Sequence, residues 1–241
     1  MWCVVCPSVD IRNTVREFRW LENCTVIEGH LQILLMDHTR TAEFEQLSFP
    51  NLREIADYFL LYRVYGLQTL SRLFPNLVAV RGQSLFFNYA LVVFEMPDLE
   101  DLGLWNLRRI VRGAVRIERN PRLCYVDTLD WSVMLDHRNV DNFVVQNRES
   151  RECVNVCPKH ETCPSLDVVM DDGVKFPQQL CWNADHCQSG ENIHSCHFQR
   201  LIGRVRPPLN RDAPNHLFIS LSTCSASELC TCCVAVFIYY M

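Results

Sequence analysis

The chain has 241 residues, of which 49% are hydrophobic, and it carries a formal net charge of −5 at pH 7. Its 23 basic residues are scattered along the sequence, which disfavours nucleic acid as a partner. No apolar stretch is as long as a membrane-spanning helix requires, and the length allows one ordinary domain with a smaller second module.

The N-terminus lacks the basic start, apolar stretch and cleavage site of a secretory signal, which by itself predicts a cytoplasmic protein. The 14 cysteines indicate the opposite, because a framework of disulfides is typical of secreted and extracellular proteins. A sequon, Asn23-Cys24-Thr25, makes Asn23 the predicted glycosylation site and favours the same setting. We therefore expect an extracellular protein.

A repeat runs through the first half of the chain. Pro-X-Leu triplets begin at Pro50, Pro75, Pro97 and Pro121, with separations of 25, 22 and 24 residues. A period in the twenties is typical of a solenoid, in which each coil buries its apolar residues against the next. The sequence thus predicts a mainly β fold, a right-handed parallel β-helix or leucine-rich-like solenoid.

Strand-like runs accompany the triplets at residues 27–34, 55–62, 80–87 and 111–118. Each has a Gly or Asp near its start, followed by β-branched or large apolar residues. The third run contains an extra residue, so its register is open by one. Because strand residues alternate between faces, three pairs are expected to point inward: Leu31/Ile33, Phe59/Leu61 and Val115/Ile117. Three pairs are then expected to point outward: Gln32/Leu34, Leu60/Tyr62 and Arg116/Glu118.

The outward residues form an apolar and aromatic strip. It comprises Leu34, Leu60, Tyr62, Phe86 or Phe87, Tyr89 and Phe94, with Arg116 and Glu118 beyond it. An exposed apolar patch usually marks a binding surface, although a later part of the same protein could cover it. Some parallel β-helices cleave acidic polysaccharides, but the strip lacks the clustered carboxylates of such enzymes. We expect no enzymatic activity and no cofactor in this chain.

The cysteines bracket the repeat and then crowd together. Cys6 and Cys24 flank the first coil, and Cys124 and Cys153 flank the region after the last repeat. Five cysteines between residues 153 and 187 indicate a small module stapled by disulfides. Zinc bound by Cys153-x3-Cys157 and Cys181-x5-Cys187, with His186 nearby, is the alternative. The second pair is wider than structural zinc sites usually use, so no metal is expected.

Several segments resemble the first leucine-rich (L1) domain of the insulin receptor and insulin-like growth factor receptor family. They are CPSVDIRN at 6–13, LENCTVIEGHLQILLM at 21–36, and the segments 63–67, 73–77, 86–96, 112–118 and 123–125. The resemblance covers about residues 4–188 and includes the start of the cysteine-rich region, where Cys181-Trp182 and His186-Cys187-Gln188 fit the family pattern. It implies a right-handed β-helix capped by disulfides. The implied pairings are Cys6–Cys24, Cys124–Cys153, Cys157–Cys181 and Cys163–Cys187.

Members of this family are dimeric receptor tyrosine kinases that bind insulin-like hormones outside the cell. The resemblance implies a hormone site that is shared with a helix from the C-terminal segment of the receptor's α-chain. The residues implied at this site are Asp10, Arg12, Asn13, Gln32, Leu34, Leu60, Tyr62, Phe86, Asn88, Tyr89, Val92, Phe94, Glu95, Arg116 and Glu118. Asp37 and Thr41 depart from the family pattern beside this surface, so the identity of the hormone is left open.

The resemblance also suggests how the chain is divided. Residues 4–152 are predicted to form the L domain, residues 153–188 to begin a furin-like cysteine-rich region, and residues 189–241 to be unrelated and disordered. No kinase motif occurs in the chain. The predicted function is that of an extracellular hormone-binding fragment of a receptor, and the alternative is a soluble decoy or structural module that does not signal.

Overall fold

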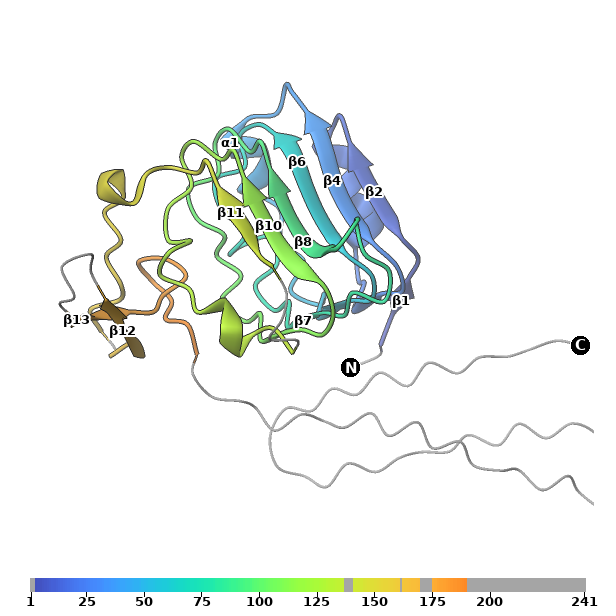
Figure 1. Cartoon of the computed structure of the whole chain (residues 1–241). Coiled ribbons are helices and arrows are strands. Elements are labelled where there is room, and N and C mark those ends of the chain that lie inside the picture. Colours follow the sequence, from blue (N-terminus) through green and yellow to red (C-terminus); the bar gives the residue numbers. More distant parts are fainter. Residues whose placement is uncertain (1–2, 137–140, 161, 170–174, 190–241) are drawn as a thin grey trace, which may run out of the picture. The chain divides into compact units, whose positions relative to one another are not determined.

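The computed structural model describes residues 3–136, 141–160, 162–169 and 175–189. These described residues form one compact unit, and most of its regular structure is parallel β-sheet (Figure 1). The predicted tail at 189–241 lies, from residue 190 on, outside the described residues. Among the described residues, no helix has the length and apolar character needed to cross a lipid bilayer.

Two parallel sheets run through the unit. The five-stranded sheet has the order β1 (Val5–Cys6), β3 (Val26–Ile27), β5 (Glu54–Ile55), β7 (Ala79–Val80) and β9 (Arg109–Ile110). The six-stranded sheet has the order β2 (Val9–Arg12), β4 (Leu31–Met36), β6 (Phe59–Val64), β8 (Tyr89–Phe94), β10 (Ala114–Glu118) and β11 (Phe143–Val145). Every pairing in both sheets is parallel. Each of the first five coils therefore contributes one strand to each sheet, and β11 belongs to the six-stranded sheet alone.

The strand runs expected from the sequence are corrected in two ways. The runs 27–34 and 55–62 each span a corner, because a short strand of the five-stranded sheet ends there before a longer strand of the six-stranded sheet begins. The run 111–118 begins after β9 has ended, and its strand β10 starts only at Ala114. The third run is wrong: Val80 ends β7, and the next strand begins only at Tyr89. Residues 81–88 make an insertion that closes as a two-residue hairpin, in which the backbone groups of Phe86 and Tyr89 bond to each other.

The core lies between the two sheets. The inward residues of the six-stranded sheet were predicted correctly, since Leu31, Ile33, Phe59, Leu61, Val115 and Ile117 are all fully buried. Ile27, Ile55, Val80 and Ile110 enter the same core from the five-stranded sheet. The leucines of the four Pro-X-Leu triplets, Leu52, Leu77, Leu99 and Leu123, are at most 1% exposed and belong to it as well. The repeat in the sequence is thus a repeat of core positions.

The remaining elements are short. The 3₁₀ helix η1 (Val15–Leu21) follows β2, and its Phe18 and Leu21 are buried. The other helices are α1 (Thr41–Phe44), η2 (Trp131–Val133) and η3 (Ser150–Glu152). An antiparallel pair, β12 (Ser165–Val169) and β13 (Lys175–Gln179), forms the only other sheet within the described ranges. The long strands of the six-stranded sheet therefore provide the extended flat face of this unit.

Candidate functional site

Two ladders of side chains cross the outward face of the six-stranded sheet. Strand register aligns one residue from each strand in the first ladder: Asp10, Gln32, Leu60, Val92, Arg116 and Phe143. The second ladder, two residues further along each strand, is Arg12, Leu34, Tyr62, Phe94, Glu118 and Val145. The outward orientation predicted for Gln32/Leu34, Leu60/Tyr62 and Arg116/Glu118 is therefore confirmed. Ten of the predicted site residues occupy these two ladders.

The centre of the face is a separate apolar cluster. Leu34, Leu60 and Val92 pack together there and are 7%, 7% and 2% exposed, although they point away from the main core. The rings of Tyr58, Tyr62, Phe86, Tyr89 and Phe94 pack around them. Aromatic rings on the same side of the sheet cover the three aliphatic side chains. The apolar area that this side of the sheet exposes to solvent therefore consists mostly of aromatic rings.

The aromatic rings are fixed by mutual stacking. Tyr62 and Phe94, opposite each other on β6 and β8, stack with ring centroids 5.4 Å apart and an interplanar angle of 19°. Tyr58 stacks on His30 at 5.0 Å and contacts Phe86 at 5.6 Å. Rings held in this way offer a rigid apolar area that loses little conformational entropy when a partner binds.

The hairpin of the insertion extends the aromatic surface. Phe86 is half-buried against the cluster, while Phe87 and Asn88 form the turn and are exposed. Phe87 is 81% exposed and has a φ of 55°, a left-handed conformation that is costly for a residue with a bulky side chain. This turn therefore holds an aromatic side chain out toward solvent.

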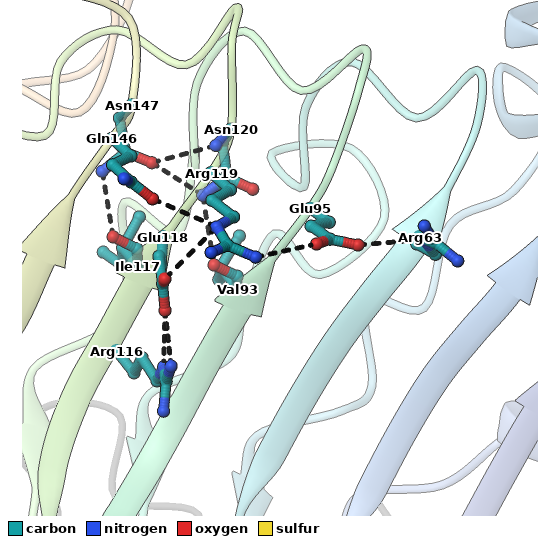
Figure 2. Close-up of polar contacts among 10 residues, drawn as sticks. All are labelled: Arg63, Val93, Glu95, Arg116, Ile117, Glu118, Arg119, Asn120, Gln146 and Asn147. Atoms are coloured by element: carbon teal, nitrogen blue, oxygen red, sulfur yellow. Dashed lines mark hydrogen bonds and ion pairs between the residues drawn. The ribbon is translucent and has the colours of Figure 1, made fainter.

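A pair of charges lies at one side of the apolar centre. The Arg116 guanidinium donates to Oε2 of Glu118 from Nε at 2.9 Å and from Nη2 at 2.5 Å (Figure 2). Glu118 is only 7% exposed. The rings of Tyr89, Phe94 and Phe143 surround Arg116, with centroids 5.3 to 5.7 Å from the guanidinium carbon. Arg116 is thus held in place by an ion pair and by cation–π contacts.

A third ladder follows the second and was only partly foreseen. It contains Asn13, Leu35, Arg63, Glu95, Arg119 and Gln146, and all six have a left-handed backbone with φ between 50° and 64°. Because the same irregularity recurs in every coil, the strands stay in register while one more side chain per coil reaches the surface. All six are exposed or half-buried.

Charges link this third ladder. Figure 2 shows Glu95 between two arginines, with its carboxylate 2.9 Å from Nε of Arg63 and 3.4 Å from Nη1 of Arg119. Arg119 also donates from Nε to the side-chain oxygen of Gln146 at 3.1 Å. The pKa of Arg63 is raised by the neighbouring Tyr62 phenol and by the Glu95 carboxylate. This charged third ladder lies beside the second ladder, which contains Tyr62 and Phe94. It can orient a partner more than it can add affinity.

All fifteen predicted site residues lie on this face or at its margin. Asp10, Arg12 and Asn13 are exposed at or just after the edge strand β2, where Arg12 lies 3.6 Å from Asp10. Asn88 is at the hairpin turn, and Gln32 donates to the Tyr58 hydroxyl at 2.6 Å. The structure therefore brings the set together as one surface. Whether that surface binds a hormone stays a prediction.

Sequence reasoning missed several members of the face. Tyr58 and His30 precede β6 and β4, and Arg63 and Arg119 follow the second ladder. Phe143 and Val145 lie on β11, a strand that no repeat motif in the sequence predicts. A signal for Arg63 and Arg119 was present, since both stand directly after an outward residue at the same point of the coil as Glu95.

Disulfides close the unit at the places that the resemblance implied. The structure contains Cys6–Cys24, Cys124–Cys153, Cys157–Cys181 and Cys163–Cys187. The alternative of a zinc site at Cys153, Cys157, Cys181 and Cys187 is therefore wrong, because these sulfurs are bonded in pairs and cannot act as thiolate ligands. Within the described ranges, no group of three or more His, Cys, Asp or Glu side chains could hold a metal ion.

The segment after residue 152 packs against the last coils. Trp182 is fully buried and meets Trp131 edge to face, with centroids 6.2 Å apart. Gln188 accepts from the Asp130 backbone N–H at 2.7 Å and donates to its carbonyl oxygen at 2.8 Å. The predicted boundary between residues 152 and 153 therefore falls within one compact unit rather than at a linker.

Comparison with known protein families defines the class of this fold. The model of the receptor L domain matches residues 23–135. That range contains β4, β6, β8 and β10, the four strands that carry the centre of the outward face. The unit is thus built on a receptor L domain.

Comparison with individual proteins identifies the relatives more closely. The chain is 56% identical over 184 residues to the insulin-like peptide receptor of Branchiostoma lanceolatum, covering 76% of this chain and 13% of that protein. It is 46% identical over 222 residues to the insulin-like growth factor 1 receptor of Xenopus laevis, covering 86% of this chain and 16% of that protein. It is 50% identical over 186 residues to the insulin receptor of Xenopus laevis, covering 76% of this chain and 13% of that protein. The chain is homologous to insulin and insulin-like growth factor 1 receptors over most of its length.

The extent of these alignments bears on function. The chain spans about one seventh of the length of these relatives. The alignment to the insulin-like growth factor 1 receptor covers 86% of the chain and so must extend beyond residue 188. The division at residue 189 therefore stays a prediction.

Proposed function

We propose that this chain is an extracellular ligand-binding segment of an insulin-receptor-like receptor tyrosine kinase. Its ligand is an insulin-like peptide hormone, bound together with a helix from the C-terminal segment of a receptor α-chain, in a dimeric receptor. The observation that carries the proposal is the rigid aromatic face over β4, β6 and β8, with a charged ladder along one border. The homology to insulin receptors supports the class of ligand.

The physical fit to a helix follows from the dimensions of the sheet. Strands of a sheet lie about 4.8 Å apart, which is close to the roughly 5.4 Å pitch of an α-helix. A helix lying across the strands can therefore set about one turn, and one apolar side chain, on each strand. Rings such as Tyr62 and Phe94 provide the large rigid contacts that usually dominate binding energy.

The proposal includes the architecture and the setting. The parallel registers support a right-handed β-helix, and we propose the L domain at 4–152, the cysteine-rich start at 153–188 and an unrelated tail at 189–241. Four disulfides favour an oxidising, extracellular compartment, and Asn23, exposed in its sequon, is the proposed glycosylation site.

The proposal is tested by replacing an aromatic residue at the centre of the face. Phe94→Arg places a charge where an apolar helix face would pack, and we expect affinity to fall by about 100-fold or more, since buried aromatic anchors contribute several kcal/mol. The probe is a labelled synthetic peptide with the sequence of the C-terminal segment of the Branchiostoma lanceolatum receptor α-subunit, with and without insulin or insulin-like growth factor 1. Binding is measured by fluorescence polarisation.

The matched control is Phe176→Arg, a similar change on β13, away from the face. Phe176 is 38% exposed, so the change should leave both folding and peptide affinity unaltered. Unchanged affinity of the Phe94→Arg variant, with its disulfides intact and its far-UV circular dichroism preserved, would refute the proposal.

A further inference from the structure

The 3₁₀ helix η1 carries an exposed aromatic residue in its last turn. Trp20 is 56% exposed and belongs to none of the apolar clusters of the described residues. Its indole N–H donates to Oε2 of Glu17 at 2.8 Å, and the guanidinium carbon of Arg19 lies 5.0 Å from the ring centroid. These contacts orient the ring without burying it. A large apolar surface is therefore held open to solvent at this point.

Burial along η1 follows a period of three residues that continues just past the end of the helix. The inward column consists of residues that are at most 1% exposed: Phe18, Leu21 and Cys24. Side chains three residues apart eclipse one another in a 3₁₀ helix, so Glu17, Trp20 and Asn23 follow each other in an outward column. The hydrogen bond from Trp20 to Glu17 shows that successive members of this column touch. Asn23, the next member, is exposed.

A tight turn holds Asn23 at the end of this column. The backbone N–H of Cys24 donates to the Leu21 carbonyl oxygen at 3.1 Å, Glu22 has φ −57° and ψ 126°, and Asn23 has φ 65°. These values define a type II β-turn, with Asn23 at the position that requires a positive φ. Even three fully extended steps would put the α-carbons of Trp20 and Asn23 only about 11 Å apart. One sugar attached to the Asn23 side chain can therefore reach the indole.

We propose that the first N-acetylglucosamine of a glycan on Asn23 packs on the indole ring of Trp20. This inference rests on the proposed glycosylation of Asn23. One face of that sugar ring presents only axial C–H groups, so packing it on an aromatic ring removes apolar area of both groups from water. The covalent link to Asn23 keeps the sugar beside the ring, which replaces the entropic cost of a free ligand with that of a short tether.

The contact exists only in the folded protein, because unfolding separates η1 from the turn. Without the sugar, Trp20 is an exposed residue whose removal has little effect on stability. With the sugar, the ring connects the last turn of η1 to the residue beside Cys24, whose disulfide with Cys6 closes the first coil. The glycan should therefore stabilise the protein only when residue 20 is aromatic.

The test compares the whole 241-residue protein with and without one sugar. The sugar-bearing form is secreted from kifunensine-treated animal cells behind a signal peptide of another protein, and endoglycosidase H then trims the glycan to a single N-acetylglucosamine. The sugar-free form is made in the bacterial periplasm, which forms disulfides and leaves Asn23 unmodified. Mass spectrometry establishes whether Asn23 carries the sugar, and urea unfolding gives the unfolding equilibrium constant of each form.

We expect the sugar to lower the unfolding equilibrium constant of the unaltered protein about fivefold, the effect of one aromatic contact. Trp20→Ala should abolish this effect. Trp20→Phe should keep most of it, because the variant retains a ring while losing the hydrogen bond to Glu17. The matched control is Phe176→Ala on β13, where an aromatic side chain that is 38% exposed is removed elsewhere, and it should leave the fivefold effect unaltered.

Nuclear Overhauser effects provide a direct second measurement. We expect them between the N-acetyl methyl group and the indole protons of Trp20, and we expect them to disappear in Trp20→Ala. If Asn23 carries the sugar, but the sugar stabilises Trp20→Ala as much as the unaltered protein and no such effects are seen, the contact is refuted and the glycosylation stands. If the secreted protein carries no glycan on Asn23, the proposed glycosylation fails and this inference fails with it. The Phe94→Arg variant tests the proposed binding face independently of either result.

Discussion

Asn120 connects three successive coils and offers a quantitative test of how the coils are held. Its Nδ2 donates to the Val93 carbonyl oxygen at 3.1 Å and to Oδ1 of Asn147 at 2.8 Å (Figure 2). Its Oδ1 accepts from the backbone N–H of Met96 at 2.9 Å. Asn120, Val93 and Met96 are all fully buried, so no solvent replaces a lost partner.

The substitution Asn120→Ala removes these bonds, so the buried Met96 N–H loses its acceptor and the buried Val93 carbonyl loses one of its donors. Each such group costs about 1–3 kcal/mol, so we expect the free energy of unfolding to fall by about 4 kcal/mol. Urea unfolding of the oxidised protein, followed by circular dichroism, measures the change.

Asn88→Ala is the matched control, because Asn88 is exposed at the hairpin turn and its side chain makes no hydrogen bond within the described structure. We expect it to change stability by less than about 0.5 kcal/mol. A loss below about 1 kcal/mol for Asn120→Ala would contradict the role of side-chain amides in connecting the coils.

Two further changes address burial and cross-linking. Burial raises the pKa of Asp101 above its ordinary value, although Thr69 donates a hydrogen bond to it at 2.7 Å. The ionised carboxylate therefore destabilises the fold at pH values above the raised pKa. This destabilisation decreases as the pH falls through the raised pKa, and it is gone below the pKa of the carboxyl in the unfolded state, about 4. Asp101→Asn should be more stable than the unaltered protein at about pH 7.5 and should lose this advantage near pH 4; a difference in urea midpoint that does not change with pH would contradict this. Replacing both Cys6 and Cys24 by Ala removes a bridge between residues 18 apart and should cost about 3 kcal/mol. An unchanged thermal midpoint of that variant would show that the bridge does not stabilise the first coil.

The inward half of the fold was predictable because it depends on local periodicity. Alternating apolar residues such as Leu31 and Ile33 can be buried together only on one side of a strand, and the triplet leucines mark the same depth in each coil. The corner between the two sheets was not predictable in the same way. Residues 28–30 join two strand-forming runs without a break in the sequence pattern, while the backbone changes direction there.

The fourth coil, where the third run was predicted, shows how an insertion misleads a prediction from sequence pattern. Residues 81–88 contain Leu85, Phe86 and Phe87, which are typical of a strand, but their hairpin leaves the sheet and the true strand starts at Tyr89. Arg63 and Arg119 were missed for another reason. Their side chains reach the surface through a left-handed backbone, and ordinary alternation assigns the residue after an outward position to the core.

The central claim is that the outward face of the six-stranded sheet is where the partner helix and hormone bind. Photocrosslinking tests it most directly, with p-benzoylphenylalanine placed at Tyr62 on the face or at Phe176 on β13. After irradiation with the labelled α-subunit peptide and hormone, we expect a covalent adduct from position 62 and none from position 176. Adducts from position 176 alone, or equal yields from both positions, would contradict the claim.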